Sequence, residues 1–298
     1  MPIVLPKRVF LDSCLLKRLA RGEWPAEERE LRDRIHRGSA RVIITGDHVT
    51  DYGDCSAENL AMKEASFVDT LHPLWLPPGN GVYHREAYSE YRRLTGDGPL
   101  PSLVPTDSHA AAMAQWIEDC PCLPSHRAAL RRLAEPELDT TFSGMIRGGF
   151  LGDSLGVGPT LADRLAQRSV FSAKRETARR RGTTDGQLDR DFRVRWVMWL
   201  SNPPAVPPGD DLINIAHLVD FSRMPAWTAL IAIWRTWNKS NTKPKQSDLT
   251  DMQHLALLPY VNVFITEKNL ADMIRQAKVG GSTLVYTDVT AWFDGEEG

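Results

Sequence analysis

Acidic residues stand at or just beyond the ends of short apolar segments that are far apart along this chain. They are Asp12 after the run at 8–11, Asp51 six residues beyond the run at 42–45, and Glu267 after the run at 263–266. Each run is brief and apolar, with β-branched residues, which is typical of a strand buried in a parallel sheet. Strand ends of an open α/β sheet are where sites are built. The pattern therefore predicts an α/β fold in which these carboxylates converge.

A further acidic pair, Asp248 and Asp251, opens an apolar helical pattern, and the spacing of three puts both side chains on one helix face. Carboxylates that converge repel one another and raise one another's pKa unless a hard divalent cation lies between them. The arrangement therefore predicts bound Mg²⁺ or Mn²⁺. A metal site of this kind acting on phosphate chemistry indicates phosphodiester hydrolysis.

The two ends of the chain alternate between strand and helix signals. We expect strands at 9–12, 41–45, 261–266 and 282–287, and helices at 26–36, 249–258 and 270–277. Such alternation indicates a parallel sheet with helices on its faces, and both ends are needed to build it. The middle has little strand signal, and the spacing of Phe192, Trp196 and Leu200 is helical. We interpret 1–60 and 222–298 as one α/β domain that carries a mostly helical insertion at 61–221.

The net charge of −2 argues against coating of nucleic acid by the whole surface, because such binding depends on neutralising phosphates. Basic residues are nevertheless concentrated locally. Residues 174–195 include eight basic and four acidic residues, and 234–245 include four basic residues and no acid. The candidates for contacts with nucleic acid are Arg179, Arg180, Arg181, Arg235, Lys239, Lys243, Lys245 and Lys268. Trp234 and Trp237 could stack on bases, although a role in the core is the stronger interpretation for Trp234.

No stretch approaches the roughly 18 uninterrupted apolar residues that a membrane span needs, and the first residues do not form the apolar segment of a signal peptide. We therefore expect a cytoplasmic protein that does not act at a membrane.

Four short segments, in order, resemble the motifs of PIN-like nucleases. Residues 9–14 resemble the first motif, a strand ending in Asp and followed by a small hydroxyl residue. Residues 45–51 resemble the second, with Asp51 where Glu is usual, and 247–256 resemble the third. Thr266 and Glu267 resemble the fourth, although many members place this acid one residue later. The resemblance covers about 8–55 and 222–290 and leaves the middle of the chain unmatched.

The resemblance implies a PIN-like α/β/α sandwich with a central, mostly parallel sheet and a large, mostly helical insertion. It also implies an endonuclease that uses one or two Mg²⁺ or Mn²⁺ ions and leaves 3′-hydroxyl and 5′-phosphate ends. Asp12, Asp248, Asp251 and Glu267 would hold the metal, with Asp51 as an outer catalytic acid. Ser13, Thr45 and Thr266 would support these acids through hydrogen bonds.

RNA is the favoured substrate, and single-stranded DNA is the other polymer considered. The family includes bacterial toxins and antiviral effectors, which implies a regulatory or antitoxin-like protein partner. Two alternatives stay open: a structure-specific DNA nuclease with the same acids, and a catalytically weak PIN-like module that binds nucleic acid or protein.

Single residues have simpler interpretations. An Asp after a strand is more often a helix cap than a metal ligand, and for Asp248 the two interpretations are equally strong. His48 and His254 lie close to the motifs, but we interpret them as packed or hydrogen-bonded residues rather than catalytic groups.

Overall fold

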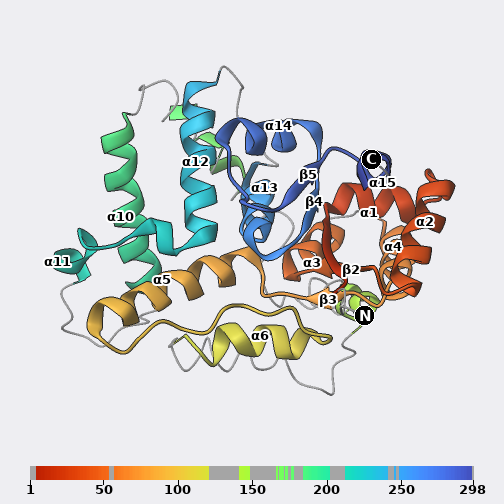
Figure 1. The fold of residues 1–298 in the computed structure, drawn as a ribbon, viewed down its shortest axis with the longest axis horizontal. Coiled ribbons are helices and arrows are strands. Elements are labelled where there is room, and N and C mark those ends of the chain that lie inside the picture. The colour runs from red at the N-terminus through yellow and green to blue at the C-terminus, as the bar shows by residue number, and fades with distance from the viewer. Residues whose placement is uncertain are drawn as a thin grey trace.

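The computed structural model describes residues 5–296, apart from 54–56, 121–140, 148–165, 167, 171, 174–175, 178–183, 202–211, 241–244 and 246–247. Five parallel strands form its sheet, in the order β3-β2-β1-β4-β5. The strands are β1 (Lys7–Leu11), β2 (Ala40–Ile44), β3 (Leu74–Trp75), β4 (Val263–Ile265) and β5 (Leu284–Tyr286). The two ends of the chain therefore build four of the five strands of one α/β sheet, as the alternation of signals predicted (Figure 1).

Side chains alternate across the sheet and divide the core in two. Val9 and Leu11 of β1 face one apolar cluster, whereas Phe10 between them faces the other. On the side of Val9 pack α1 (Ser13–Ala20), α2 (Pro25–His36), α4 (Glu58–Asp69) and α15 (Val289–Glu296). Buried apolar clusters lie on both faces of the sheet. Strands that are buried on both faces have almost uninterrupted apolar sequences, as these strands do.

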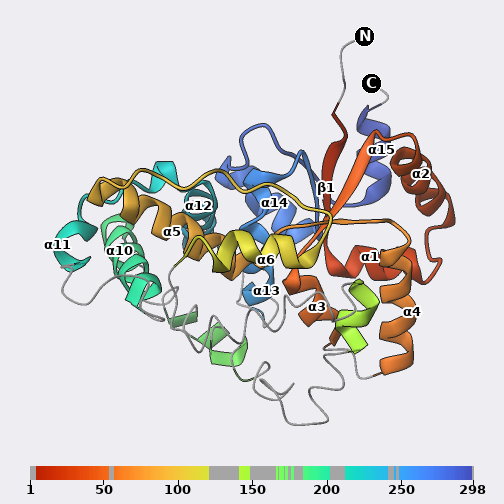
Figure 2. The ribbon, with the colours of Figure 1, turned by 90° about the horizontal axis from the view of Figure 1, so that it is seen from below.

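The side of Phe10 carries the larger cluster. Its main helices are α5 (Gly79–Thr95), α10 (Asp185–Ser201), α12 (Pro225–Lys239), α13 (Asp248–Leu255) and α14 (Lys268–Ala277). The other described α-helices are α3 (Gly46–Gly53), α6 (His109–Ile117) and α11 (Leu212–Ala216). Figures 1 and 2 both place α10 and α11 at the end of the molecule away from α2 and α4. The helical spacing of Phe192, Trp196 and Leu200 is confirmed, since all three are buried on α10.

The segment at 61–221 contributes more to the sheet than the sequence analysis expected. Strand β3 lies within it and pairs with β2, through Ile43 with Leu74 and Ile44 with Trp75. Most of α4 also comes from this segment, and α4 packs against α1. The described helical part that extends away from the sheet therefore begins after β3, with α5.

Candidate functional site

The direction in which the chain winds reverses between β1 and β4. From β1 the chain builds β2 and β3 on one side, and it later returns to place β4 against the other side of β1. A crevice outside the carboxyl ends of the strands is expected at such a switch point. Asp12 directly follows β1, and Glu267 follows β4 after Thr266. The fold therefore places two of the predicted acids on adjacent strands at the switch point.

Asp12 and Glu267 occupy the positions before α1 and α14, where an acid commonly caps a helix. Neither side chain makes a capping hydrogen bond. Asp12 is buried, and its Oδ2 accepts a hydrogen bond from the Thr266 hydroxyl at 2.8 Å, whereas Glu267 is exposed. Helix capping does not account for either acid.

Asp248 differs from these two acids. Its Oδ2 accepts a hydrogen bond of 2.7 Å from the backbone N–H of Lys245, at the start of α13. The carboxylate thus binds the backbone three residues before it, ahead of the first turn of α13. The observed contact of Asp248 is therefore a structural one.

Asp251 lies over the same edge of the sheet on α13. Burial, and then the nearby charge of Asp12, raise its pKa to about 7, with a smaller contribution from Glu267. Burial also raises the pKa of the Cys14 thiol, and the next causes are the charges of Asp12, Glu267 and Asp251. The three carboxylates therefore share one electrostatic environment, which favours a cation between them.

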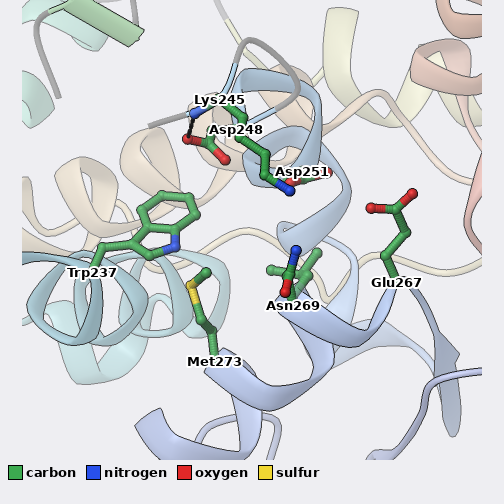
Figure 3. A pocket seen from close by; sticks show the side chains of 8 residues that line it. Trp237, Lys245, Asp248, Asp251, Glu267, Asn269 and Met273 are labelled. Atoms are coloured by element: carbon green, nitrogen blue, oxygen red, sulfur yellow. Dashed lines mark hydrogen bonds between the residues drawn. The ribbon is translucent and has the colours of Figure 1, made fainter. Parts of the chain in front are cut away.

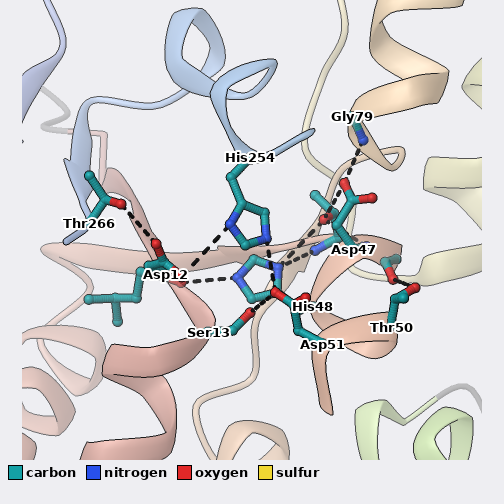
Figure 4. A network of polar contacts seen from close by, with 12 residues as sticks. Asp12, Ser13, Asp47, His48, Thr50, Asp51, Gly79, His254 and Thr266 are labelled. Carbon is teal, nitrogen blue, oxygen red and sulfur yellow. Dashed lines mark hydrogen bonds and ion pairs between the residues drawn. The ribbon is translucent and has the colours of Figure 1, made fainter. Parts of the chain in front are cut away.

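Asp51 reaches the site from α3 and lies in a network of polar contacts (Figure 4). Its Oδ2 accepts a hydrogen bond from Ser13 Oγ at 2.9 Å, and its Oδ1 lies 3.4 Å from the Arg168 guanidinium. Burial raises the pKa of Asp51, and the charge of His254 opposes that shift. Lys17 donates a hydrogen bond of 2.9 Å to the Asp51 carbonyl.

His254 lies between two of the acids, and this position was not expected. Its Nδ1 is 3.8 Å from Asp12 Oδ1, and its Nε2 is 3.5 Å from Asp51 Oδ2. Both ring nitrogens are buried without a hydrogen-bond partner among the described residues. Burial alone would lower the pKa of His254, but the charges of Asp12 and Asp51 raise it above its ordinary value. The charges of Asp12 and Asp51 therefore favour the protonated form of His254 inside the acidic cluster.

His48 is the packed, hydrogen-bonded residue that the sequence analysis expected. Its ring stacks on that of His254 at 5.1 Å, and its Nε2 lies 3.0 Å from the carbonyl oxygen of Leu11. The Nδ1 atom accepts a hydrogen bond of 3.2 Å from the backbone N–H of Thr45. Burial lowers the pKa of His48 to about 3. The ring is therefore neutral at physiological pH and donates through Nε2.

Asp47 is a site residue that the sequence analysis missed. It is buried in the first turn of α3, where its Oδ2 accepts hydrogen bonds from the backbone of Gly79 at 2.6 Å and from Thr45 Oγ1 at 3.3 Å. The available signal was its position, because Asp47 is closer to the end of β2 than Asp51 is. Thr45 thus contacts Asp47, while Ser13 contacts Asp51 and Thr266 contacts Asp12.

A small pocket opens beside the acids, between α12, α13 and α14 (Figure 3). Its volume of about 20 Å³ accommodates about one water molecule. Its labelled lining residues are Trp237, Lys245, Asp248, Asp251, Glu267, Asn269 and Met273. Three predicted acids, Asp248, Asp251 and Glu267, therefore share a surface with one of the predicted basic residues, Lys245.

The other basic candidates lie in different surroundings. Arg235 and Lys239 approach Asp185 of α10 at 3.7 and 4.0 Å, and Lys268 is exposed at the start of α14. Lys243 and the run Arg179, Arg180 and Arg181 lie outside the described residues.

The acids are not arranged as a completed metal site. Within the described part of the chain, no group of three or more His, Cys, Asp or Glu side chains is placed to hold a metal ion. The donor chemistry fits a hard cation, since Asp12, Asp251 and Glu267 supply carboxylate oxygens in one electrostatic environment. Metal binding would therefore require these side chains to move closer together.

Among the described helices, none is long and apolar enough to cross a membrane. Comparisons of this chain with protein-family models, with curated proteins and with solved structures give no match.

Proposed function

We propose that this protein is a PIN-like, metal-dependent endonuclease that hydrolyses phosphodiester bonds, with RNA as the favoured substrate. The observation that carries the proposal is the gathering of Asp12, Asp251 and Glu267 at the switch point of the sheet. Asp12 and Glu267 are not used as helix caps, and proximity to other carboxylates contributes to the raised pKa of Asp251. Such positions, where repulsion is maintained in the folded protein, are enriched in functional sites.

The proposed roles follow from the positions of the side chains. Asp12, Asp251 and Glu267 would hold Mg²⁺ or Mn²⁺, which when bound supplies an activated water and offsets charge on the phosphate. Thr266 orients Asp12 through its hydrogen bond, and Ser13 orients Asp51. Asp248 takes an outer role, because its carboxylate holds the start of α13.

The substrate would pass over the pocket that Lys245 and Trp237 line beside the acids. That pocket is too small for a nucleotide, so the strand would lie across its opening with a phosphate near Lys245. Lys and Arg hold single strands through their phosphates, so single-stranded DNA is the second polymer to compare. In this proposal the protein acts as a toxin or defence nuclease that a regulatory partner controls.

One observation favours a second candidate, a PIN-like module that binds nucleic acid or protein without efficient catalysis. His254 lies within 3.8 Å of Asp12 and 3.5 Å of Asp51, so a side chain already compensates part of the acidic charge. In this alternative the acids and His254 would form a buried ion-pair network that serves structure.

Cleavage of labelled RNA and of matched single-stranded DNA, in Mg²⁺ and in Mn²⁺, separates the two candidates. Asp12→Asn and Asp251→Asn keep the side-chain shape and remove one carboxylate each. As a nuclease, the wild type cleaves, and each variant loses about 100-fold or more in rate. The matched control is Asp272→Asn on α14, whose carboxylate pairs with Arg275 at 3.2 Å and should not affect cleavage. If the wild type is as inactive as both variants while it still binds the strand, the binding module is the better description.

A further inference from the structure

A groove lies at the edge of the sheet opposite the acids. It is formed by the end of α2, the start of β2 and the segment between α4 and β3, all at the amino ends of strands. Its volume is about 590 Å³, within the range of roughly 300–1,000 Å³ that is usual for small-molecule sites. Its polar lining consists of Arg32, Asp33, His36, Arg41, Thr70 and His72. The groove therefore has the size of a ligand site, and its lining includes two arginines and one acidic residue.

Arg32 is held in a defined position in this groove. Its Nε donates a hydrogen bond of 2.9 Å to Glu28, and its Nη1 donates one of 2.9 Å to Thr70 Oγ1. The guanidinium also lies over the ring of Phe67, 4.9 Å from its centroid. A cation that is already ordered loses little further entropy when it binds a ligand.

Arg41 has unused donors. The one hydrogen bond of its side chain within the described residues runs from Nη2 to the carbonyl oxygen of His72, at 3.4 Å, and no described acid pairs with the guanidinium. Its Nε is buried and has no hydrogen-bond partner among the described residues. A buried donor without a partner is destabilising, and an oxygen of a ligand would satisfy it. The unsatisfied atom belongs to a residue that lines the groove.

His72 adds an independent observation. Its backbone has φ of +47°, in the left-handed region that residues other than glycine seldom adopt. The carbonyl oxygen of His72 accepts the hydrogen bond from Arg41, and His72 itself lines the groove. Backbone strain of this kind is concentrated at binding and catalytic sites.

We propose that this groove binds a phosphate group through Arg41 and Arg32. The planar guanidinium presents parallel N–H donors that match the oxygens of phosphate, and an arginine at such a site is not replaceable by lysine. The phosphate belongs to a small nucleotide or to the 5′ end of a strand, and the test separates these sources. The groove shares no residue with the acidic cluster, so this inference does not depend on the proposed nuclease function.

The test is calorimetric titration of the full chain with three probes: inorganic phosphate, AMP, and a short RNA with or without a 5′-phosphate. Arg41→Gln is expected to weaken binding about tenfold or more, because it removes both the positive charge and the parallel N–H donors of the guanidinium. Arg41→Lys is expected to recover only part of the affinity. Arg8→Gln is the matched control, since Arg8 pairs with Arg41 across β1 and β2 but does not line the groove. Tighter binding of AMP identifies a nucleotide, whereas tighter binding of the 5′-phosphorylated RNA identifies a strand end.

Arg32→Gln serves as a second variant, in case Arg41→Gln does not fold. Thermal unfolding without ligand shows whether each variant is folded. Asp12→Asn should bind inorganic phosphate and AMP like the wild type, even if it abolishes cleavage. The proposal is overturned if no probe binds the wild type. It is also overturned if the folded Arg41→Gln and Arg32→Gln variants bind as tightly as the wild type, which would indicate an adventitious ion only.

Discussion

The imidazole of His254 points its Nδ1 at the carboxylate of Asp12, 3.8 Å away, although the two residues are on α13 and at the end of β1. This contact connects α13 with the end of β1, the central strand of the sheet. The protonated form of His254, which the charges of Asp12 and Asp51 favour, opposes the repulsion among the carboxylates.

Removal of the His254 imidazole should destabilise the fold. We expect His254→Ala to lower the free energy of unfolding by about 3 kcal/mol, because Asp12 and Asp51 lose a buried partner. Urea denaturation measures the change, and the exposed His217→Ala is the control, with an expected change within about 0.5 kcal/mol. Adding Asp51→Asn to His254→Ala should restore part of the stability. Simple addition of the two losses would contradict the charge-compensation account.

Gly79 permits a close approach between α5 and α13. A Cβ at this position would lie 2.1 Å from the backbone oxygen of Gln253. Gln253 is on α13, between Asp251 and His254. We expect Gly79→Ala to cost about 1–3 kcal/mol and to displace α13. Gly186→Ala is the matched control on α10, where an added Cβ meets nothing within 4 Å. That control should be stabilised by about 0.5–1 kcal/mol in urea denaturation, whereas equal effects in both variants would argue against the packing constraint.

Glu86 should make stability depend on pH. Its carboxylate accepts hydrogen bonds from the N–H groups of Ala226 and Trp227 at the start of α12, and burial raises its pKa from 4.5 to about 7. The folded state therefore holds a proton that the unfolded state releases. Stability from this group is fully present below pH 4.5 and is lost as pH rises through 7.

The measurement is urea denaturation of wild type and Glu86→Gln between pH 5 and pH 8. The wild type should lose more stability over this range than the variant, by on the order of 3 kcal/mol. The exposed Glu118→Gln should keep the wild-type slope. Parallel slopes for wild type and Glu86→Gln would show that Glu86 is not protonated in the fold.

Lys245 tests the substrate path beside the acids. Lys245→Ala should weaken binding of single-stranded RNA of any sequence, because Lys245 would contact phosphate rather than bases. The slope of log affinity against log salt should fall by about 0.7 if one contact with a single strand is lost. Lys63→Ala, an exposed lysine on α4, is the control and should leave the slope unchanged. The same slope in all three proteins would place the strand elsewhere.

Much of the sheet could be predicted from sequence, because buried parallel strands are continuous apolar runs. Strands β1, β2, β4 and β5 overlap the predicted segments, each one or two residues from the expected bounds. Strand β3 could not be found this way, since Leu74 and Trp75 are only two residues and offer no periodicity. Its place in the sheet depends on tertiary pairing with β2.

The candidate site was predictable where an acid lies one or two residues beyond the end of a strand, as Asp12 and Glu267 do. The contact of His254 with Asp12 and Asp51 was not predictable, because it depends on how α13 crosses the edge of the sheet. The same limit applies to Asp47, whose role depends on the approach of Gly79 from α5. Local signals specify strand ends, whereas contacts between distant helices are decided by packing.

In the proposed function, Asp12, Asp251 and Glu267 together hold a divalent cation. Calorimetric titration with Mn²⁺ at pH 8, above the pKa of about 7 for Asp251, tests it most directly on wild type, Asp251→Asn and Asp272→Asn. We expect Mn²⁺ to bind the wild type and Asp272→Asn with similar affinity, and Asp251→Asn at least about tenfold more weakly. Equal Mn²⁺ affinity in all three proteins, or no binding by the wild type, would contradict it.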